Sequence, residues 1–500
     1  MKPLSEFEIW FVTGSLDLYG DSVLAEVDDH ARSVVAFLDA EPEVPVRITR
    51  KSVVTGPDAI RRLCLEANSS DTCLGMIAWM HTFSPAKMWI AGLTVLQKPL
   101  LHLHTQFNRD LPWAEIDMDF MNLNQSAHGD REFGYLLSRM RLRRKAVVGH
   151  WEDPLVARRI ATWSRAACGW HEAQTLRIAR FGDNMRQVAV TEGDKVEAQL
   201  RLGFAVNSYG VSDLAAVVQS VPDEEVDRLV NDYDDRYAMK PELRQGGERR
   251  SALRDAARIE AGLRAFLDAE GCNAFTDTFE DLDGLVQLPG IAAQRIMADG
   301  YGFGAEGDWK TAALVRIAKV MSAGLPGGTS FMEDYTYHLA PEGPRVLGAH
   351  MLEVCPSLTS DTPSCEIHPL AIGGKQDPVR LVFTATPGEG VVIGLLDLGE
   401  RFRLVANVVD VTRPNEDLPR LPVACAVWEP RPDLMTAAET WLRAGGPHHT
   451  CLSLALGMEA FIDFAEIAGV ELAVIDDKTE AREFEKELRW NDLHYLLRGG

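Results

Sequence analysis

The chain has 500 residues, a formal net charge of −23 at pH 7 and a pI near 5.0. Hydrophobic residues make up 46% and charged residues 25%, which is ordinary for a folded globular protein and argues against disorder. An acidic chain lacks the positive surface that nucleic acids require, so we exclude them as partners; the one dense basic run, Arg139–Lys145, is interpreted as a solvated helix end.

The sequence carries no sign of secretion or membrane insertion. The amino terminus lacks the apolar segment of a signal peptide, and no run approaches the roughly 18–20 apolar residues that span a bilayer. The eight cysteines occur singly with no Cys-x-x-Cys pair, which fits reduced thiols better than a disulfide framework or a zinc ribbon. We therefore expect a cytoplasmic protein with no membrane partner.

The first 175 residues alternate strand-like and helix-like patterns. Apolar runs at 8–13, 46–54, 74–80, 99–104 and 145–149 indicate strands, and the segments 24–38, 85–96 and 155–167 have helical spacing. This alternation predicts a largely parallel sheet with helices on both faces. Ligands bind such sheets at the carboxyl ends of the strands, where the loops 14–20 and 81–85 are expected.

The remaining chain divides into two segments of different style. Residues 176–325 continue the α/β pattern, with strands at 175–180 and 273–279 and a helix through 253–266. After residue 326, short alternating runs at 379–384, 391–396 and 401–409 are joined by Gly- and Pro-containing turns, which favours an antiparallel barrel or sandwich. An α–β–α stretch at 437–444, 471–475 and 481–488 closes the chain. We expect three domains of α/β class: 1–175, 176–325 and a β-rich 326–500.

One glycine motif formally matches the dinucleotide fingerprint G-x-G-x-x-G. In Gly302-Phe-Gly-Ala-Glu306-Gly307, a cofactor role would need a strand before the motif and a free helix N-terminus after it. The preceding segment 291–299 has a helical pattern, and Glu306 would point a negative charge at the phosphates. We interpret the motif as a glycine-rich turn that carries a functional carboxylate.

Carboxylates and imidazoles occur in unusual surroundings in this region and beyond it. They are Glu306 and Asp308 in the glycine turn, Glu333-Asp334 after Gly327-Gly328, His350, and the tandem His448-His449 after Gly445-Gly446. Oxygen and nitrogen donors without thiolates suit Mn²⁺ or a similar divalent ion. Their separations match no local ligand motif, so spacing alone leaves solvated charges and a core histidine as alternatives. Adjacent residues of an extended segment point opposite ways, so one of the tandem histidines would face a metal.

Taken in order along the whole chain, several long strings resemble the L-arabinose isomerase family. They are Trp10-Phe-Val-Thr-Gly-Ser15, His81-Thr-Phe-Ser-Pro-Ala-Lys-Met-Trp89, Met118-Asp-Phe-Met-Asn-Leu-Asn-Gln125, Arg180-Phe-Gly-Asp-Asn-Met-Arg186, Glu306-Gly-Asp-Trp-Lys310, Gly327-Gly-Thr-Ser-Phe-Met-Glu-Asp-Tyr335, His350-Met-Leu-Glu-Val-Cys-Pro356 and His448-His449-Thr450. The resemblance implies two Rossmann-like doubly wound domains followed by a β-rich, barrel-like domain. It also implies a homo-oligomer, a hexamer or a tetramer.

The activity implied is that of an aldose–ketose isomerase of arabinose catabolism. It would convert L-arabinose to L-ribulose by an enediol-type proton transfer, and D-galactose to D-tagatose more slowly. The family's Mn²⁺ ligands, one ion per subunit with Co²⁺ as another option, fall on Glu306, Glu333, His350 and His449, and its acid/base pair on the two glutamates. Its sugar contacts fall on Leu18, Phe83, Gln125, His128, Met185, Phe279 and Ile372, with Gln125 and His128 supplied by a neighbouring subunit.

One position departs from the family pattern. The family usually has glutamine after the Gly-Ser of the first loop, whereas this chain has Leu16, which cannot hydrogen-bond the distal end of a sugar. A related isomerase or epimerase with another sugar preference is therefore the alternative, and a non-catalytic sugar-binding protein is a third. His128 is our candidate for opening the sugar ring, because a neutral imidazole exchanges protons near pH 7.

Overall fold

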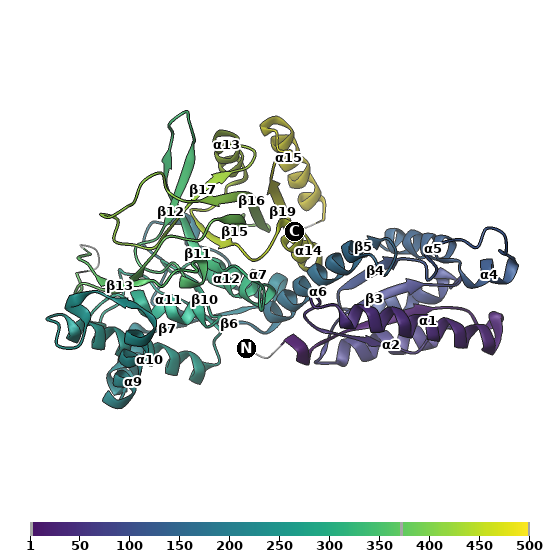
Figure 1. Ribbon diagram of the computed structural model, residues 1–500, viewed down its shortest axis with the longest axis horizontal. Coiled ribbons are helices and arrows are strands. Elements are labelled where there is room, and N and C mark those ends of the chain that lie inside the picture. The colour runs from purple at the N-terminus through teal and green to yellow at the C-terminus, as the bar shows by residue number, and fades with distance from the viewer. Residues whose placement is uncertain (1–3, 371–373, 499–500) are drawn as a thin grey trace. The chain divides into compact units, whose positions relative to one another are not determined.

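The computed structural model describes residues 4–370 and 374–498. The chain forms two compact units. The first contains the described residues up to His171 together with Glu459–Gly469, and the second contains Glu172–Met458 together with the described residues from Val470 onward. Figure 1 shows the helices and strands of both units.

A five-stranded parallel sheet forms the centre of the first unit. Its strand order is β2-β1-β3-β4-β5, a doubly wound arrangement. The strands are β1 Glu8–Gly14, β2 Arg47–Arg50, β3 Cys73–Met80, β4 Leu100–His104 and β5 Lys145–Val148. The helices are α1 Gly20–Ala40, α2 Pro57–Ser69, α3 Ile90–Val95, α4 Met118–Leu123, α5 Ser126–Arg139, α6 Pro154–Thr175, which crosses into the second unit, and α14 Met458–Ala468.

Burial explains this arrangement. All eight residues of β3 are buried, as expected for a central strand covered on both faces. Side chains from α2, α3 and α5 pack on the face that carries Met76 and Met80, while Trp163 of α6 lies against Gly75 on the other face. Because β1 and β3 are neighbours, the loops after Gly14 and Met80 meet at one edge of the sheet, as the sequence predicted.

Helix α14 comes from late in the chain and belongs to the first unit. The Lys145 ammonium of β5 binds the Glu459 carboxylate at 2.6 Å and the Asp463 carboxylate at 2.7 Å, and Arg159 binds Glu459 at 3.0 Å. The sequence placed this segment with the β-rich region, because spacing along the chain carries no signal for such a return.

The second unit contains a four-stranded parallel sheet of order β10-β9-β6-β7. Its strands are β6 Arg177–Phe181, β7 Ala205–Tyr209, β9 Ala274–Thr276 and β10 Gly302–Gly304. Its helices are α7 Lys195–Leu202, α8 Val211–Ser220, α9 Asp223–Arg236, α10 Arg250–Glu270, α11 Gly290–Ala298 and α12 Trp309–Met321.

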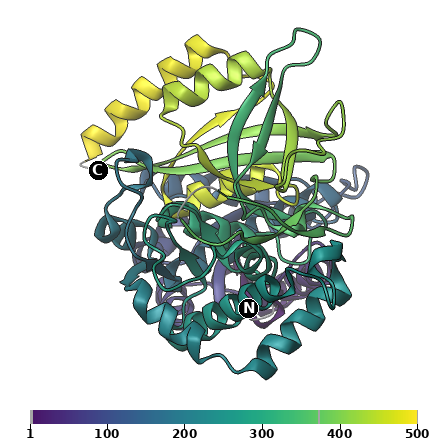
Figure 2. The same ribbon diagram turned by 90° about the vertical axis from the view of Figure 1, so that its left-hand side faces the viewer.

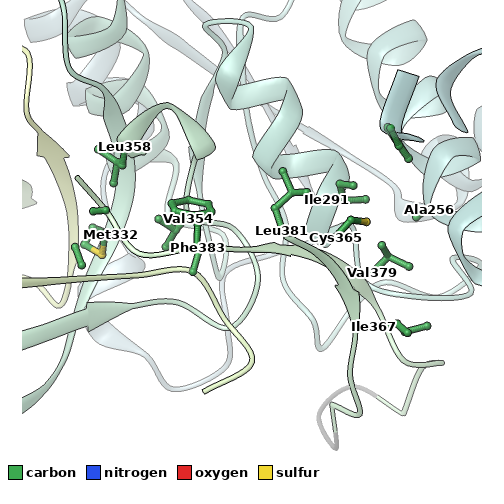
Figure 3. Close-up of a cluster of buried hydrophobic side chains, with 14 of the residues drawn as sticks. Ala256, Ile291, Met332, Val354, Leu358, Cys365, Ile367, Val379, Leu381 and Phe383 are labelled. Atoms are coloured by element: carbon green, nitrogen blue, oxygen red, sulfur yellow. The ribbon is translucent and has the colours of Figure 1, made fainter. Parts of the chain in front are cut away.

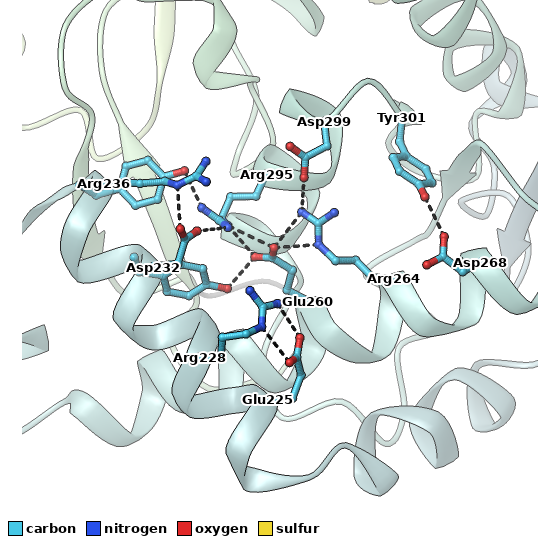
Figure 4. A network of polar contacts seen from close by, with 12 residues as sticks. Glu225, Arg228, Asp232, Arg236, Glu260, Arg264, Asp268, Arg295, Asp299 and Tyr301 are labelled. Carbon is cyan, nitrogen blue, oxygen red and sulfur yellow. Dashed lines mark hydrogen bonds and ion pairs between the residues drawn. The ribbon is translucent and has the colours of Figure 1, made fainter. Parts of the chain in front are cut away.

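A buried ionic network ties α9, α10 and α11 together (Figure 4). Glu260 of α10 is 0% exposed and accepts hydrogen bonds from Arg295 at 2.8 Å, from Arg264 at 2.9 Å and from the Tyr233 hydroxyl at 2.6 Å. Arg295 also binds Asp232 at 2.7 Å. A buried carboxylate is tolerated here because both of its oxygens accept hydrogen bonds, two of the three donors being cationic.

The closing third of the chain forms a six-stranded antiparallel barrel, in agreement with the predicted barrel-like fold. Neighbouring strands pair in the order β15-β18-β11-β12-β17-β16, and β16 pairs back onto β15 to close it. The strands are β11 Thr329–His338, β12 Arg345–Ala349, β15 Gly388–Asp397, β16 Phe402–Thr412, β17 Cys425–Pro430 and β18 His449–Ser453. Strand β19, Glu471–Ile475, adds in parallel to β16. Helices α13 Leu434–Ala444 and α15 Ala481–Arg498 lie side by side outside it (Figure 2).

One predicted barrel strand lies elsewhere. The run at 379–384 forms β14, Val379–Val382, which pairs with β13, Ser364–Ile367, in a small sheet that also contains β8, Ala238–Met239. Its other edge is occupied by glutamine side chains: Gln294 accepts from the Leu381 N–H at 2.7 Å and donates to the Leu381 carbonyl at 3.0 Å. Side chains from β14, α11 and β11 then share one core cluster (Figure 3).

The predicted fold class is thus confirmed. Each of the two units contains a Rossmann-like parallel sheet with helices, and the second unit also contains the β-barrel. Among the described residues, no helix is long and apolar enough to cross a membrane. The division into three domains at 175 and 325 stays a prediction.

Candidate metal centre

Glu306 lies in a tight turn between a strand and a helix. Strand β10 ends at Gly304 and α12 begins at Trp309, so part of what the sequence suggested as a glycine turn is a strand. Glu306 has a left-handed backbone, with φ of 61°. The neighbouring Gly307 has φ of 78°, and a Cβ there would lie 2.5 Å from the Asn184 Cα, so only glycine fits. The turn therefore fixes the Glu306 carboxylate at the end of the parallel sheet.

The structure agrees with the rejection of a dinucleotide motif in this segment. The segment before the motif is the helix α11, as predicted, and β10 consists of the first three residues of the motif itself. The N-terminus of α12 is capped within the chain, because the Asp308 carboxylate accepts a hydrogen bond from the Thr311 N–H at 3.2 Å. An anion at this helix end would compete with a buried carboxylate, so the motif remains unsuited to pyrophosphate.

The barrel positions the two histidines. His350 follows the last residue of β12, and His449 begins β18, with β11 between these two strands. Phe331 of β11 is buried and contacts both imidazoles edge-on, with ring centroids 5.0 and 5.1 Å away. The ladder and this phenylalanine hold rings from residues 99 positions apart at a centroid distance of 5.9 Å.

Three of the four predicted ligands lie together. One ligand atom from each of Glu306, His350 and His449 lies within 4.8 Å of the others. Glu333 pairs in register with His449 on one side and Ala349 on the other, but its carboxylate is outside this group. Of the tandem histidines, His449 is buried and belongs to the cluster, whereas His448 is 39% exposed and lies outside it, as the strand alternation predicted, although its imidazole lies 3.9 Å from the Glu306 carboxylate.

Each clustered histidine has a carboxylate partner on its other ring nitrogen. The Nδ1 of His350 lies 2.5 Å from the Glu353 carboxylate, and the Nδ1 of His449 lies 3.3 Å from the Asp308 carboxylate. The Nε2 of His449 is buried and has no hydrogen-bond partner among the described residues. Carboxylates that orient an imidazole in this way accompany metal-binding histidines, so the donor set of one oxygen and two nitrogens fits a divalent ion.

The charges of the centre are mutually stabilising. Burial raises the pKa of the Glu306 carboxyl, but the imidazoles of His448, His449 and His350 outweigh it and hold that pKa below its usual value. For His350 burial lowers the pKa, yet the Glu353, Glu333 and Glu306 carboxylates raise it overall. Protons therefore compete with any cation for this site as the pH falls.

Two predicted sugar contacts lie beside the cluster. Phe279 lines a small cavity together with Glu306 and His350. The backbone N–H of Met185 donates to the Glu306 carbonyl at 3.0 Å, which ties the loop after β6 to the turn. Asp277 also lines the cavity, and burial raises the pKa of its carboxyl to about 8. Ile372 lies outside the described residues.

The other four predicted sugar contacts belong to the first unit. Phe83 lies against the ring of His128, with centroids 4.7 Å apart, and the Gln125 side chain reaches the Tyr19 hydroxyl at 3.4 Å. Leu18 is 86% exposed. These residues gather at the carboxyl ends of β1 and β3, where the Ser15 and Thr82 hydroxyls hydrogen-bond at 2.7 Å.

The carboxylates that hold the histidines were not assigned from the sequence. Asp308 appeared only as a neighbour of Glu306, and Glu353 only as part of a string. The His350-x-x-Glu353 spacing is a usable signal, because residues three apart in a turn meet, whereas the Asp308–His449 contact joins residues far apart in the sequence.

Three families match the chain in succession: the L-arabinose isomerase N-terminal domain at residues 3–175, the central domain at 177–324 and the C-terminal domain at 328–471. L-arabinose isomerase of Nocardioides sp. is 62% identical over 495 residues, which cover 99% of each chain. Those of Herpetosiphon aurantiacus and Geobacillus stearothermophilus are 58% and 56% identical, covering 100% and 99% of each chain.

The fold and the matches along its length define a sugar-isomerase type of α/β enzyme with an appended barrel. The chain belongs to the L-arabinose isomerase family and is an isomerase.

Proposed function

We propose that the protein interconverts L-arabinose and L-ribulose. The observation that carries this proposal is identity of 55–62% over nearly the whole chain with proteins named L-arabinose isomerase. The clustering of Glu306, His350 and His449 supports it, because moving a proton next to a carbonyl needs a base together with stabilisation of charge on oxygen.

In this proposal one Mn²⁺ per subunit, with Co²⁺ as a substitute, is held by Glu306, Glu333, His350 and His449. When bound, the ion supplies Lewis-acid stabilisation of negative charge on O1 and O2 of the open-chain sugar. The buried carboxylates of Glu353 and Asp308 keep the histidine Nε2 atoms directed to the centre. Glu333 lies next to His449 in the ladder, and the proposal requires a change of its side-chain rotamer that brings its carboxylate to the cluster.

The two glutamates then divide the proton transfers of an enediol-type isomerisation. One carboxylate removes the proton from C2 of the aldose and delivers it to C1. The other takes the O2 hydroxyl proton and returns it to O1, so that an aldehyde becomes a hydroxymethyl group and C2 becomes the ketone carbon. A carboxylate that holds a metal through one oxygen needs its second oxygen free for this work.

We further propose a homo-oligomer, hexameric or tetrameric, in which Gln125 and His128 of a neighbouring subunit complete the sugar site with Leu18, Phe83, Met185, Phe279 and Ile372. Exposed apolar side chains in the segment before Gln125 support a covered surface there: Trp113 is 81%, Met118 64% and Met121 50% exposed. His128 opens the sugar ring in this scheme. The eight free cysteines are all buried, which supports the proposed cytoplasmic location.

The test of the reaction uses protein stripped with a chelator. L-arabinose is added with and without Mn²⁺, and ketopentose is assayed. Formation of L-ribulose only with metal is the expected result. Absence of ketose under both conditions, with the protein folded, would contradict the proposed reaction.

A mixing experiment tests the shared site. Subunits carrying Glu306→Gln and subunits carrying His128→Asn are each expected to be inactive alone. If each site takes His128 from a neighbour, random mixed oligomers contain about one quarter of sites with both native residues, and activity returns to that level. No recovery after verified subunit exchange would place both residues in one chain's site.

A second candidate function is isomerisation or epimerisation of another sugar, and Leu16 is the observation that favours it. Slower conversion of D-galactose to D-tagatose is the expected side activity. A panel of pentoses and hexoses, ranked by kcat/KM, distinguishes the candidates.

A further inference from the structure

The first unit contains a cavity of about 480 Å³ that the proposed isomerase site does not use. It lies among α3, the start of β4, the start of β5, α6 and α14. It is therefore at the amino ends of the sheet strands, whereas the four predicted sugar contacts of this unit lie at the carboxyl ends of β1 and β3. Its volume is in the range of small-molecule sites.

Basic side chains without acidic partners surround one part of this cavity. Lys98, Arg143 and Arg144 line it, and none of the three forms an ion pair with a described carboxylate, although Glu466 lines the same cavity. Lys98 donates to the Ser70 carbonyl at 3.1 Å, and Arg144 to the Ser138 hydroxyl at 2.9 Å. The chain has a net charge of −23, so three cations without a carboxylate partner are unusual in it and indicate an anion-binding site. Guanidinium groups favour phosphate among anions.

Two buried polar atoms of the lining lack partners among the described residues. The Trp163 Nε1–H is a donor, and the Asp463 Oδ2 is an acceptor whose sister oxygen already binds Lys145 at 2.7 Å. The two residues are 1% and 3% exposed. Because buried polar groups are almost always hydrogen-bonded, these two atoms call for a ligand with an acceptor and a donor.

The rest of the lining suits a flat ring. Trp163 and Trp170 contribute indoles, and Leu96, Ile462 and Ile467 contribute aliphatic surface. Indole faces stack on the flat rings of nucleobases, and neither a pentose nor an inorganic anion has a flat aromatic ring. A purine carries a hydrogen-bond donor and an acceptor on the same edge.

We propose that this cavity binds a purine nucleoside phosphate. The base lies among the indoles and aliphatic side chains, with its donor on the Asp463 Oδ2 and its acceptor on the Trp163 Nε1–H. The phosphate lies on Lys98, Arg143 and Arg144. The cavity shares no lining residue with the candidate metal centre, so the proposal can be tested independently of the proposed isomerase reaction.

Calorimetric titration of the metal-free, full-length protein tests the proposal, because nucleotides cannot then act by removing a metal. The probes are ADP, GDP, adenosine, ribose 5-phosphate and inorganic phosphate. We expect saturable binding of ADP or GDP at one site per chain, with adenosine, ribose 5-phosphate and phosphate each at least tenfold weaker.

Variants locate the site. Arg144→Ala is expected to weaken nucleotide binding about tenfold and to leave adenosine unchanged, whereas Trp170→Leu weakens both. Arg139→Ala is the matched control, because it removes the same charge from the same basic run outside the cavity. Thermal unfolding of each variant verifies the fold.

Three results would overturn the inference. The first is no binding of either nucleotide at millimolar concentration. The second is binding of ribose 5-phosphate or phosphate as tight as that of ADP, which would indicate an anion site without base recognition. The third is an equal loss in Arg139→Ala and Arg144→Ala, which would indicate general electrostatic attraction.

Discussion

Replacing Glu353 by glutamine tests whether the carboxylates behind the histidines determine metal affinity. Glu353 is 7% exposed, and its carboxylate lies 2.5 Å from the His350 Nδ1 and accepts a hydrogen bond from the Leu352 N–H at 3.1 Å. Glutamine keeps the volume and one acceptor oxygen but removes the charge. Loss of such a partner weakens metal binding by about 10–100-fold, or roughly 1.4–2.7 kcal/mol.

Calorimetric titration of the chelator-stripped protein with Mn²⁺ gives the affinity, and L-ribulose formation at saturating Mn²⁺ gives kcat. We expect a weaker Kd with kcat close to that of the parent protein. Glu342→Gln, in the exposed turn after β11, makes the same charge change and should alter neither. An unchanged Kd, or a loss of kcat at full occupancy without a change in Kd, would refute the reasoning.

The same variant predicts a change in pH dependence. In the parent protein the carboxylates raise the pKa of His350, so protons compete with the metal from a higher pH than for an ordinary histidine. Removing the Glu353 charge lowers that pKa, and the loss of Mn²⁺ affinity on acidification shifts to lower pH. A shift in the opposite direction would contradict the assigned cause.

Three further outcomes follow from other parts of the chain. Glu260→Gln leaves Arg264 and Arg295 facing a neutral group in the buried network. Urea titrations should show a loss of about 3–5 kcal/mol in the free energy of unfolding. The control Glu225→Gln, which removes a charge from an ion pair nearer the surface, should lose less than about 1 kcal/mol. Burial raises the pKa of Asp463 to about 6, so ionisation of this carboxyl opposes folding. Relative to the variant Asp463→Asn, the stability of the parent protein should therefore fall by at most about 3 kcal/mol as the pH rises from about 4 through 6. The same dependence of stability on pH in both proteins would refute this. Leu16→Gln should change the ratio of kcat/KM for L-arabinose to that for D-galactose, and an unchanged ratio would show that this position does not contact the sugar.

The sequence predicts elements whose burial pattern is local. The run at 74–80 is apolar throughout because β3 is covered on both faces, and the alternation at 391–409 reflects the barrel strands β15 and β16. Strand β14 has the same local pattern but leaves the barrel, because Gln294 and Gln287 occupy its free edge with side-chain amides. No periodicity within β14 can report a partner that lies on another element.

The candidate metal centre, too, could be predicted from the sequence only in part. The types of its ligands were available from the sequence because carboxylates and imidazoles in glycine-rich surroundings are unusual, and the resemblance to a family supplied their positions. The contacts that orient these ligands could not be predicted from the sequence, since Asp308 and His449 are far apart along the chain and come together only in the fold. The register of β11 against β12 and β18 is what turns three distant segments into neighbours.

That register also explains why the centre joins the parallel sheet to the barrel within the second unit. Glu306 comes from the carboxyl end of β10, whereas His350 and His449 come from the ends of barrel strands on either side of β11. A one-residue slip of β18 against β11 would exchange the buried His449 for the 39%-exposed His448 in that ladder position. The buried Thr329 and Ser453 hydroxyls, which hydrogen-bond at 2.9 Å at the far end of the same ladder, oppose that slip. The metal centre therefore depends on residues well away from it, and the ladder is as much a part of the site as its ligands.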